Sequence, residues 1–522
     1  MIALLLSSFA FAETLRLTLD VHDGTISVVE ALRVPGAVKA PPSADGPGLT
    51  VYDAVGRVIS EVKLPTTAHR SVIFPDGGGA SATLTRGQLV VELPWPESAH
   101  HAVLDGRTLT PSAPPPPAPG VAVAVQSAGP PEERLDLVFL GDGYTSSELD
   151  TFAADVDRIV AYLLQVEPYG AYTGLFNIWR VDQASNESGA SHYEQSPAEV
   201  RDTAYGCYYG CGGIDRLICC DDSAVLTEVR AAVPGYDGVM VLVNDPVYGG
   251  SGGFAYATSY TADPYGSQVA AHELGHSLVG LWDEYSYGTT GSGNGAPNCA
   301  DDGEAPPWTA WLGESGVDAF KPCSYTNLYR PTNNGCMMNT LQDGYCPVCR
   351  EQAVLAIYEK LPGVIYAESP AEGALTLAPG VDHDLTVSTL GPDDGSLSVL
   401  WDIDGVQVGE GVSFTLEGCV DGAVLRARAY DPTAWVRVDD AGVTSDERLW
   451  TLDAAGCPAP GEDSGDSDPG GEADSGADGE NDGDKDGDKS GRCGCAGATA
   501  PAGLSAAILA ILVARRRRSQ LC

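Results

Sequence analysis

The stretch His272-Glu273-Leu274-Gly275-His276 decides how the middle of this chain is interpreted. Its two histidines are four residues apart, so on an α-helix they share one face and both imidazoles can reach one metal ion. Glu273 lies beside them and can take a proton from a water whose pKa a zinc ion has lowered. The opposite face of the helix carries apolar side chains at Val269, Leu274, Leu278 and Leu281. The sequence therefore predicts a zinc-binding helix that is buried on one side and ends at Gly280.

A catalytic zinc ion needs a third protein ligand and an open position for water. The two acidic residues that follow the helix, Asp283 and Glu284, are the nearest candidates. We expect Asp283 to be the third ligand and keep Glu284 as the alternative; a solvated helix end would also explain the acidic pair. Tyr285 is a candidate for stabilising an oxyanion, and a packing role explains it equally well.

A methionine-containing turn follows further along, at Gly335-Cys336-Met337-Met338-Asn339. The chain has only four methionines, and two of them occur here. In metzincin-like sites a methionine packs beneath the histidine ligands and takes no part in the chemistry. The sequence predicts this role for Met337 or Met338 and does not decide between them.

The first part of the chain is predicted to contain a signal peptide and a small β domain. Residues 1–12 are apolar and end in Ala10-Phe11-Ala12, a small-x-small cleavage pattern, although no Lys or Arg precedes the apolar run. Residues 13–110 contain alternating runs, such as 15–19 and 89–93, between turn signals, which is typical of a β-sandwich. The Pro-rich residues 111–122 are predicted to be a linker.

The middle of the chain, residues 123–362, is predicted to hold the metal-binding helix within a mixed domain. Residues 135–140 and 239–243 have the composition of buried strands, and apolar residues show helical spacing over 147–165. Such alternation indicates an α/β or α+β layered core. Residues 363–457 return to short alternating strands and predict an immunoglobulin-like β domain, which Cys419 and Cys457 could close. We therefore expect an α+β chain with a β-sandwich domain on each side of the central domain.

The end of the chain is predicted to be unfolded and then anchored. Residues 458–492 contain almost only Gly, Asp, Glu, Ser, Pro and Lys, which predicts an acidic disordered stalk. Within it, residues 481–488 are a weak candidate for binding Ca²⁺, because the closing Glu of an EF-hand loop is missing. Residues 493–522 contain Cys493-Gly494-Cys495, an apolar run predicted to be a transmembrane helix, and four consecutive arginines. This order resembles the MYXO-CTERM type of bacterial sorting signal; a plain membrane anchor is the alternative.

Charge and cysteine content narrow the class of protein. The formal net charge of -43 argues against a nucleic-acid partner, because phosphate recognition needs clustered Lys and Arg. Fourteen cysteines, most of them in clusters, predict disulfides in an exported chain. Cys346-Pro347-Val348-Cys349 has no second CxxC motif to pair with, so we expect disulfides there and not a redox site or a zinc ribbon.

Several segments together resemble the IgA-peptidase family of metallopeptidases. The resemblance extends over roughly residues 130 to 360. Its segments are 138–145, 176–181, 185–189, 213–219, 272–285, 336–338 and 346–351. It implies a zincin-like, metzincin-like fold and a zinc endopeptidase in which His272 and His276 bind the metal and Glu273 is the general base. It also implies that an acidic residue of Leu281-Trp282-Asp283-Glu284-Tyr285 is the third ligand.

The predicted function is therefore a secreted or surface-anchored zinc endopeptidase with polypeptide substrates and membrane contact through its C-terminal helix before processing. The alternative is a surface adhesion or binding protein whose metal site is inactive. A third hypothesis is zinc-dependent hydrolysis of another bond, such as an ester. The N-terminal domain is a candidate inhibitory prodomain, and it contains no cysteine that could act as a cysteine-switch latch, because none precedes Cys207.

Overall fold

The computed structural model describes residues 13–36, 46–75, 78–116, 122–253, 255–293, 295–378, 380–418 and 420–453. All of them belong to one compact unit, Met1–Ala459. The predicted signal peptide, the acidic stalk with its candidate calcium segment, the sorting signal, and both Cys419 and Cys457 lie outside the described residues. No helix in the described part of the chain combines the length and the apolar composition that crossing a bilayer requires.

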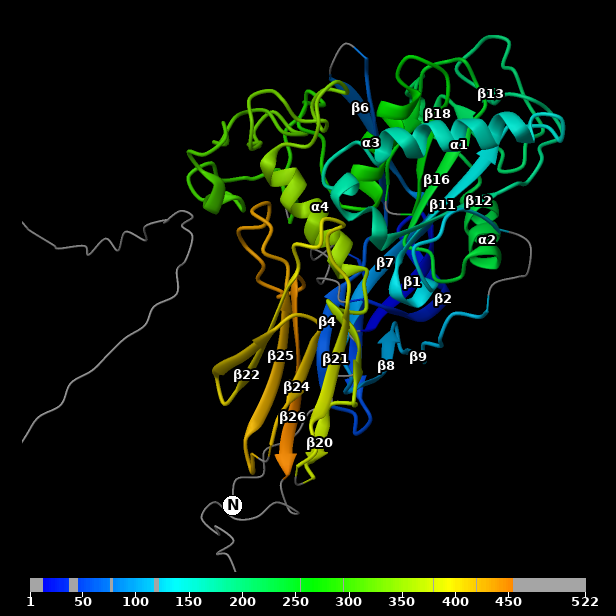
Figure 1. The fold of residues 1–522 in the computed structure, drawn as a ribbon. Coiled ribbons are helices and arrows are strands. Elements are labelled where there is room, and N and C mark those ends of the chain that lie inside the picture. Colours follow the sequence, from blue (N-terminus) through cyan, green and yellow to red (C-terminus); the bar gives the residue numbers. More distant parts are fainter. Residues whose placement is uncertain are drawn as a thin grey trace, which may run out of the picture. The chain divides into compact units, whose positions relative to one another are not determined.

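A six-stranded sheet forms the centre of the molecule (Figure 1). Its strand order is β10 (Ala122–Gln126), β12 (Phe176–Val181), β11 (Leu135–Asp142), β16 (Gly238–Val243), β18 (Ala257–Tyr260) and β17 (Gly250–Ser251). The four inner strands are parallel, whereas β10 and β17 run antiparallel at the two edges. Every residue of β11 and β16 is buried, as expected for parallel strands that are covered on both faces.

Helices cover both faces of this sheet. On one face, α1 (Leu149–Leu163), α3 (Gly266–Ser277) and α4 (Pro347–Glu359) share a core cluster with Leu137, Phe139 and Met240. On the other face, α2 (Asp222–Ala232) packs on Val138, Leu140 and Val241. The helix predicted over 147–165 is confirmed as α1, which buries the five apolar residues Phe152, Val156, Ile159, Val160 and Leu163.

The connections contain shorter elements. They are the 3₁₀ helices η1 (Pro131–Glu133), η2 (Tyr169–Leu175), η3 (Cys211–Gly213) and η4 (Thr309–Trp311), and a small sheet of β13 (Ser191–His192), β14 (Tyr208–Tyr209) and β15 (Ile218–Cys219).

The described residues between 13 and 109 contain strands and no helix. One sheet has the order β2 (Thr25–Pro35), β1 (Glu13–His22), β7 (Arg86–Trp95), and another has β4 (Val58–Lys63), β3 (Gly48–Asp53), β8 (Ala99–Leu104), β9 (Arg107–Leu109). Strands β1, β7, β3 and β8 contribute to a single hydrophobic cluster. A separate hairpin, β5 (Ala68–Ile73) and β6 (Gly79–Leu84), extends from this region toward the central sheet, where Ser71 forms an antiparallel bridge with Gly252.

Two further sheets follow α4. The first is β19 (Ile365–Ser369), β21 (His383–Thr389) and β24 (Ser413–Leu416). The second is β20 (Gly373–Thr376), β26 (Ser445–Asp453), β25 (Val424–Tyr430), β22 (Ser398–Ile403) and β23 (Val406–Glu410). The chain is therefore of mixed α+β class, as predicted. The zincin-like and sandwich classes and the domain boundaries stay predictions.

Cysteine pairing agrees with the sequence analysis in one part and differs in another. Three disulfides are present among the described residues, Cys207–Cys220, Cys211–Cys219 and Cys299–Cys323. The disulfide expected at Cys346 and Cys349 is wrong, because both are buried free thiols, as is Cys336. The prediction failed because it considered the CxxC motif alone, whereas the fold brings a third cysteine and a carboxylate to the same place.

Candidate active site

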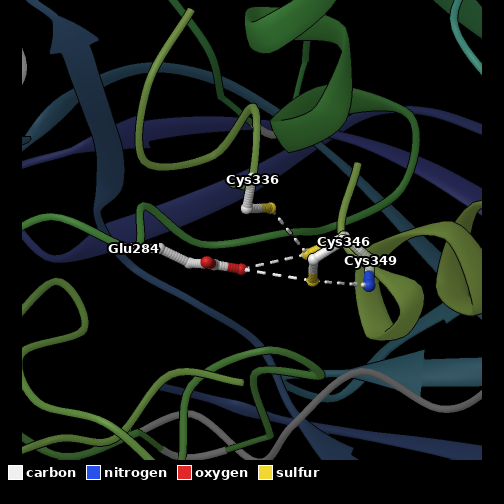
Figure 2. Close-up of side chains that lie close together, drawn as sticks. All are labelled: Glu284, Cys336, Cys346 and Cys349. Atoms are coloured by element: carbon white, nitrogen blue, oxygen red, sulfur yellow. Dashed lines mark hydrogen bonds between the residues drawn. The ribbon is translucent and has the colours of Figure 1, made fainter. Parts of the chain in front are cut away.

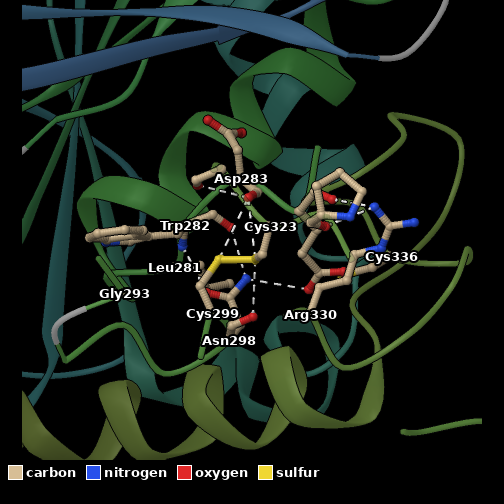
Figure 3. Close-up of a disulfide and its surroundings, with 12 residues drawn as sticks. Leu281, Trp282, Asp283, Gly293, Asn298, Cys299, Cys323, Arg330 and Cys336 are labelled. Carbon is tan, nitrogen blue, oxygen red and sulfur yellow. Dashed lines mark hydrogen bonds between the residues drawn. A yellow bond between two sulfur atoms is a disulfide. The ribbon is translucent and has the colours of Figure 1, made fainter. Parts of the chain in front are cut away.

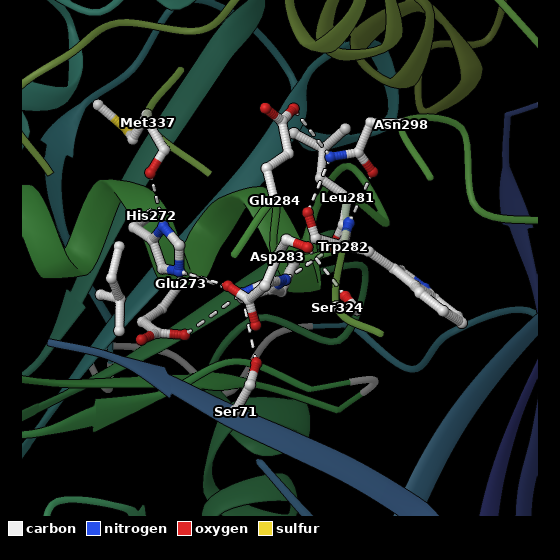
Figure 4. A network of polar contacts seen from close by, with 12 residues as sticks. Ser71, His272, Glu273, Leu281, Trp282, Asp283, Glu284, Asn298, Ser324 and Met337 are labelled. Carbon is white, nitrogen blue, oxygen red and sulfur yellow. Dashed lines mark hydrogen bonds and ion pairs between the residues drawn. The ribbon is translucent and has the colours of Figure 1, made fainter. Parts of the chain in front are cut away.

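Three potential ligand atoms from α3 and the loop after it converge on one point (Figure 4). Nε2 of His272 lies 3.2 Å from Nε2 of His276. Oδ1 of Asp283 lies 3.1 Å from the first and 3.3 Å from the second of these nitrogens. His272 and Asp283 are fully buried, and His276 is nearly so.

These distances fit a zinc ion. Zinc–nitrogen and zinc–oxygen bonds of about 2.0–2.2 Å place neighbouring ligand atoms of a tetrahedral site about 3.3 Å apart. Oδ1 of Asp283 accepts no hydrogen bond from the described residues, although it is buried. A buried carboxylate oxygen that faces two imidazole nitrogens without a donor is stabilised by a cation among them.

Backbone carbonyls fix the orientation of both imidazoles. His272 donates from Nδ1 to the carbonyl oxygen of Met337 at 2.9 Å, and His276 donates from Nδ1 to that of Leu281 at 2.7 Å. Each ring therefore presents Nε2 to the metal position, as is usual for ligating histidines. Helix α3 ends at Ser277, three residues before the predicted Gly280. Gly280 has a φ of 76° and turns the chain so that the Leu281 carbonyl reaches back to His276.

Both methionines of the predicted turn lie beneath the site, but in different roles. Met337 supplies the carbonyl group that orients His272. Met338 packs its sulfur against α3, where a Cβ on Gly275 would come within 2.9 Å of it. Met338 is therefore the candidate for the predicted side-chain role, and Met337 contacts His272 through its backbone.

The loop that carries Asp283 is held on several sides (Figure 3). Asn298 bonds both the amide and the carbonyl of Trp282, each at 2.8 Å, and Ser324 donates to the carbonyl of Asp283 at 2.9 Å. The disulfide Cys299–Cys323 lies against the same carbonyl, with one sulfur 3.5 Å from its oxygen. Tyr287 donates to Oδ2 of the Asp283 side chain at 2.6 Å. The carboxylate is therefore held in place by its own surroundings.

Glu273 is fully buried, and neither carboxylate oxygen has a hydrogen-bond partner among the described residues. Its Oε2 lies 3.9 Å from Nε2 of His276, farther than Asp283 is from either histidine. Burial raises the pKa of Glu273 well above its ordinary value. A carboxyl group beside the metal position lies where a general base has to be.

Electrostatics separate the two acidic groups of the site. Burial alone would raise the pKa of Asp283, but His276 and His272 hold it well below its ordinary value. The pKa of His276 rises to about 9, because the attraction of Asp283 outweighs the effect of burial, whereas burial lowers that of His272. Asp283 is therefore ionised, as a metal ligand must be.

The remaining residues of the predicted motif lie elsewhere. Glu284 turns away from the histidines, and its Oε1 lies 3.1 Å from the sulfur of Cys349, which favours Asp283 as the third ligand. Tyr285 packs beside His272 with ring centroids 6.5 Å apart, and its buried hydroxyl has no partner among the described residues.

The N-terminal region contributes residues that the sequence analysis missed. His69 and Ser71 of β5 line a cavity of about 220 Å³ together with His276, Trp282 and Tyr287. Oγ of Ser71 lies 3.5 Å from Nε2 of His276. No local pattern links residues 200 positions apart, so only the fold reveals this wall of the site. The only hint of Tyr287 in the sequence is its position four residues after the predicted ligand Asp283.

Metallopeptidases bind zinc with the same arrangement, a buried helix that carries two histidines and a glutamate together with a carboxylate from outside that motif. Residues 123–311 match the family model of IgA Peptidase M64, which confirms the predicted resemblance over that segment. The match includes α3 and Asp283, and it indicates a metallopeptidase. Residues 336–351 lie beyond the matched segment. No curated protein matches the chain.

Proposed function

We propose that this protein is a zinc-dependent endopeptidase that acts outside the cell. The observation that carries the proposal is the convergence of His272, His276 and Asp283 within 3.1–3.3 Å beside an unpartnered Glu273. Zinc held by these three residues would supply Lewis-acid chemistry and make a water acidic enough to deprotonate near neutral pH. Glu273 takes that proton on its carboxylate and delivers it to the amine that leaves.

Other residues prepare the site for this chemistry. The carbonyls of Met337 and Leu281 keep both imidazoles in the orientation that exposes Nε2. The cavity beside His276 has aromatic walls at Trp282, Tyr287 and Tyr325, which suits a polypeptide side chain next to the reacting bond. Tyr285 is the candidate oxyanion donor, because its hydroxyl is free of protein partners among the described residues.

Disulfides and the predicted signal sequences support an exported location. Three disulfides persist only in oxidising compartments, which agrees with an extracellular protein. The proposed location is the cell surface, reached through residues 1–12 and held through residues 493–522.

Cleavage of unfolded casein by the full chain tests this proposal. We expect the wild type and Glu273→Ala to retain zinc at the histidine site equally, and the variant to lose activity by about 10²–10⁴-fold, the usual contribution of a general base. A further variant, His272→Ala with His276→Ala, should lose both that zinc ion and activity. If the wild type retains no zinc there, the protein is better explained as a surface adhesion module. Equal activity of Glu273→Ala would remove the base assignment.

A further inference from the structure

Four metal-ligand side chains gather at a second place, separate from the histidine site (Figure 2). They are Glu284, Cys336, Cys346 and Cys349, all buried, and their ligand atoms lie within 4.8 Å of one another. The Cys349 sulfur lies 3.1 Å from Oε1 of Glu284 and 3.6 Å from the Cys336 sulfur, and the Cys346 sulfur lies 3.9 Å from Oε1 of Glu284.

This spacing is that of a tetrahedral zinc site. Zinc–sulfur bonds of about 2.3 Å place two thiolates about 3.8 Å apart, and a thiolate and a carboxylate oxygen about 3.5 Å apart. The sulfurs are too far apart for a disulfide, whose sulfur–sulfur bond is about 2.05 Å. Three thiolates and one carboxylate match the ligand types that zinc accepts, whereas Ca²⁺ and Mg²⁺ prefer oxygen alone.

Pairing of the cysteines would leave the cluster unsatisfied. A disulfide uses two of the three sulfurs, so one thiol would remain buried with the Glu284 side chain. Oε2 of Glu284 already lacks a hydrogen-bond partner among the described residues, and the Glu284 side chain has no exposed surface. A buried carboxylate oxygen without a partner is costly, and a metal ion bound by the carboxylate offsets that cost.

Several polar neighbours offset part of the cost of negative charge in this buried cluster. Cys346 is the N-cap of α4 and its sulfur accepts from the amide of Cys349 at 3.5 Å, so the positive end of the helix faces the thiols. Asn298 donates to Oε1 of Glu284 at 3.3 Å. The buried guanidinium of Arg330 binds the Glu284 carbonyl at 2.7 Å and adds a positive charge nearby.

We propose that Glu284, Cys336, Cys346 and Cys349 bind a second, structural zinc ion. The site closes all four coordination positions with protein groups, which is typical of structural zinc. It joins the loop after α3, the methionine turn and the start of α4. Residues that are adjacent in sequence belong to the two sites. Asp283 is part of the histidine site and Glu284 of the thiol site. Cys336 is likewise followed by Met337, whose carbonyl orients His272. The ion therefore fixes the frame of the first site, and its presence does not depend on the proposed activity.

Metal content of the purified full chain provides the first test. We expect two zinc ions per chain in the wild type and one in His272→Ala with His276→Ala, because that variant keeps the thiol site. Cys349→Ser should also lose one zinc ion. Val348→Ala, which shortens a buried neighbour without removing a ligand, is the matched control and should retain two. Absence of zinc from the double histidine variant, or the same zinc content in Cys349→Ser as in the wild type, overturns the proposal.

Two measurements on chains with intact cysteines guard against variants that do not fold. X-ray absorption at the zinc edge of the double histidine variant should show sulfur neighbours at about 2.3 Å; a shell of nitrogen and oxygen alone contradicts the site. Alkylation of the wild type in denaturant with chelator and without reductant, followed by peptide mapping, should label Cys336, Cys346 and Cys349. A disulfide between any two of them, or iron in place of zinc, also overturns the proposal.

Discussion

The hydrogen bond from the Tyr287 hydroxyl to the Asp283 carboxylate is shorter than the bonds that orient His272 and His276. The donated hydrogen bond of 2.6 Å occupies Oδ2 and leaves Oδ1 for the two histidines. Partners of this kind fix how a ligand approaches its metal, and their loss lowers metal affinity or activity by roughly 10–100-fold. Tyr287 would therefore affect a metal ion at this site through Asp283.

Tyr287→Phe should lower the affinity of the histidine site for zinc by about 10–100-fold. Titration with a competing chelator measures this affinity, and the structure supplies a matched comparison. Tyr285→Phe removes a hydroxyl that accepts and donates no hydrogen bond among the described residues, so it should leave zinc affinity unchanged. If Tyr285→Phe lowers kcat at unchanged zinc content, its oxyanion role is supported. Equal zinc affinity of wild type and Tyr287→Phe would show that Asp283 needs no such support.

The parts of the site that the sequence predicted are those defined by local spacing. His272, Glu273 and His276 follow from the helical repeat, and Asp283 lies only seven residues beyond the motif. The role of Glu284 could not be predicted, because its partners lie 52 to 65 positions away in sequence and no periodicity connects them.

Strand β17 and helix α3 meet at the residue after the strand, Gly252. A Cβ there would lie 2.6 Å from both Cβ and Cδ2 of His276 and 2.9 Å from Oε2 of Glu273. Only the absence of a side chain lets the sheet edge come this close to the two catalytic-site residues. Glycine is therefore required at position 252 because of the neighbouring His276 and Glu273, and not because of the strand itself.

Gly252→Ala should displace the His276 imidazole and reduce both zinc content and casein cleavage, by about tenfold or more. Gly235→Ala is the control, because a Cβ there meets nothing within 4 Å. Far-ultraviolet circular dichroism of both variants tests whether the fold is kept. Full activity of Gly252→Ala would mean that β17 can retreat from α3 without disturbing the ligands.

At the level of elements, strong periodicity was predictive and irregular loops were not. The strands at 135–140 and 239–243 became β11 and β16, and the helix over 147–165 became α1, because uniform burial or a 3.6-residue repeat defines each one. The end of α3 followed from Gly280, because its left-handed φ of 76° and its amide bond to the His276 carbonyl at 3.1 Å close the turn that follows the last helical residue, Ser277. Long loops between α3 and α4 have no repeat, and they hold Asp283, Glu284 and the disulfide Cys299–Cys323.

At the scale of the whole molecule, buried charges join the N-terminal strands to the central region. Glu92 of β7 pairs with Arg16 of β1 at 2.8 Å and with Lys360 just after α4. Arg16 also reaches Asp237 at 3.3 Å. Burial alone would raise the pKa of Glu92, but the charges of Lys360 and Arg16 have the larger combined effect and lower it from 4.5 to about 2. The ionised form of Glu92 therefore stabilises the folded chain.

Glu92→Gln should destabilise the chain by about 3 kcal/mol near pH 7, because it leaves two buried cations without their carboxylate. The folded pKa lies below the unfolded value, so this contribution is present above about pH 4.5 and is lost as the pH falls toward about 2. The stabilities of wild type and variant from urea unfolding should therefore differ near pH 7, approach each other below about pH 4.5 and converge only near pH 2. Arg57→Gln, which alters an exposed arginine of the same region, should show no such difference. If the difference in free energy of unfolding between wild type and Glu92→Gln does not depend on pH, the effect comes from packing and not from charge.

Strand β5 is docked on the edge of the central sheet, where an extended polypeptide would add as a further strand. Ser71 bridges to Gly252, and the neighbouring Arg70 is buried against Ser251 at 3.1 Å and Asp222 at 3.4 Å. The guanidinium of Arg70 also covers the Tyr256 ring at 4.4 Å. These contacts hold His69 and Ser71 at the cavity beside His276, so a substrate that added to the same edge would have to displace β5.

Arg70→Gln should therefore raise casein cleavage, by an amount on the order of tenfold if the lost contacts contributed about 1.4 kcal/mol to docking. The rise should be in kcat/KM, because the catalytic residues are unchanged while the sheet edge becomes free. Arg86→Gln, which breaks an exposed pair with Asp23 in the same region, should leave cleavage unchanged. A fall in kcat/KM at unchanged folding stability would mean that β5 is part of the productive substrate site. In that case the N-terminal region is a permanent wall of the enzyme and cannot be a removable prodomain.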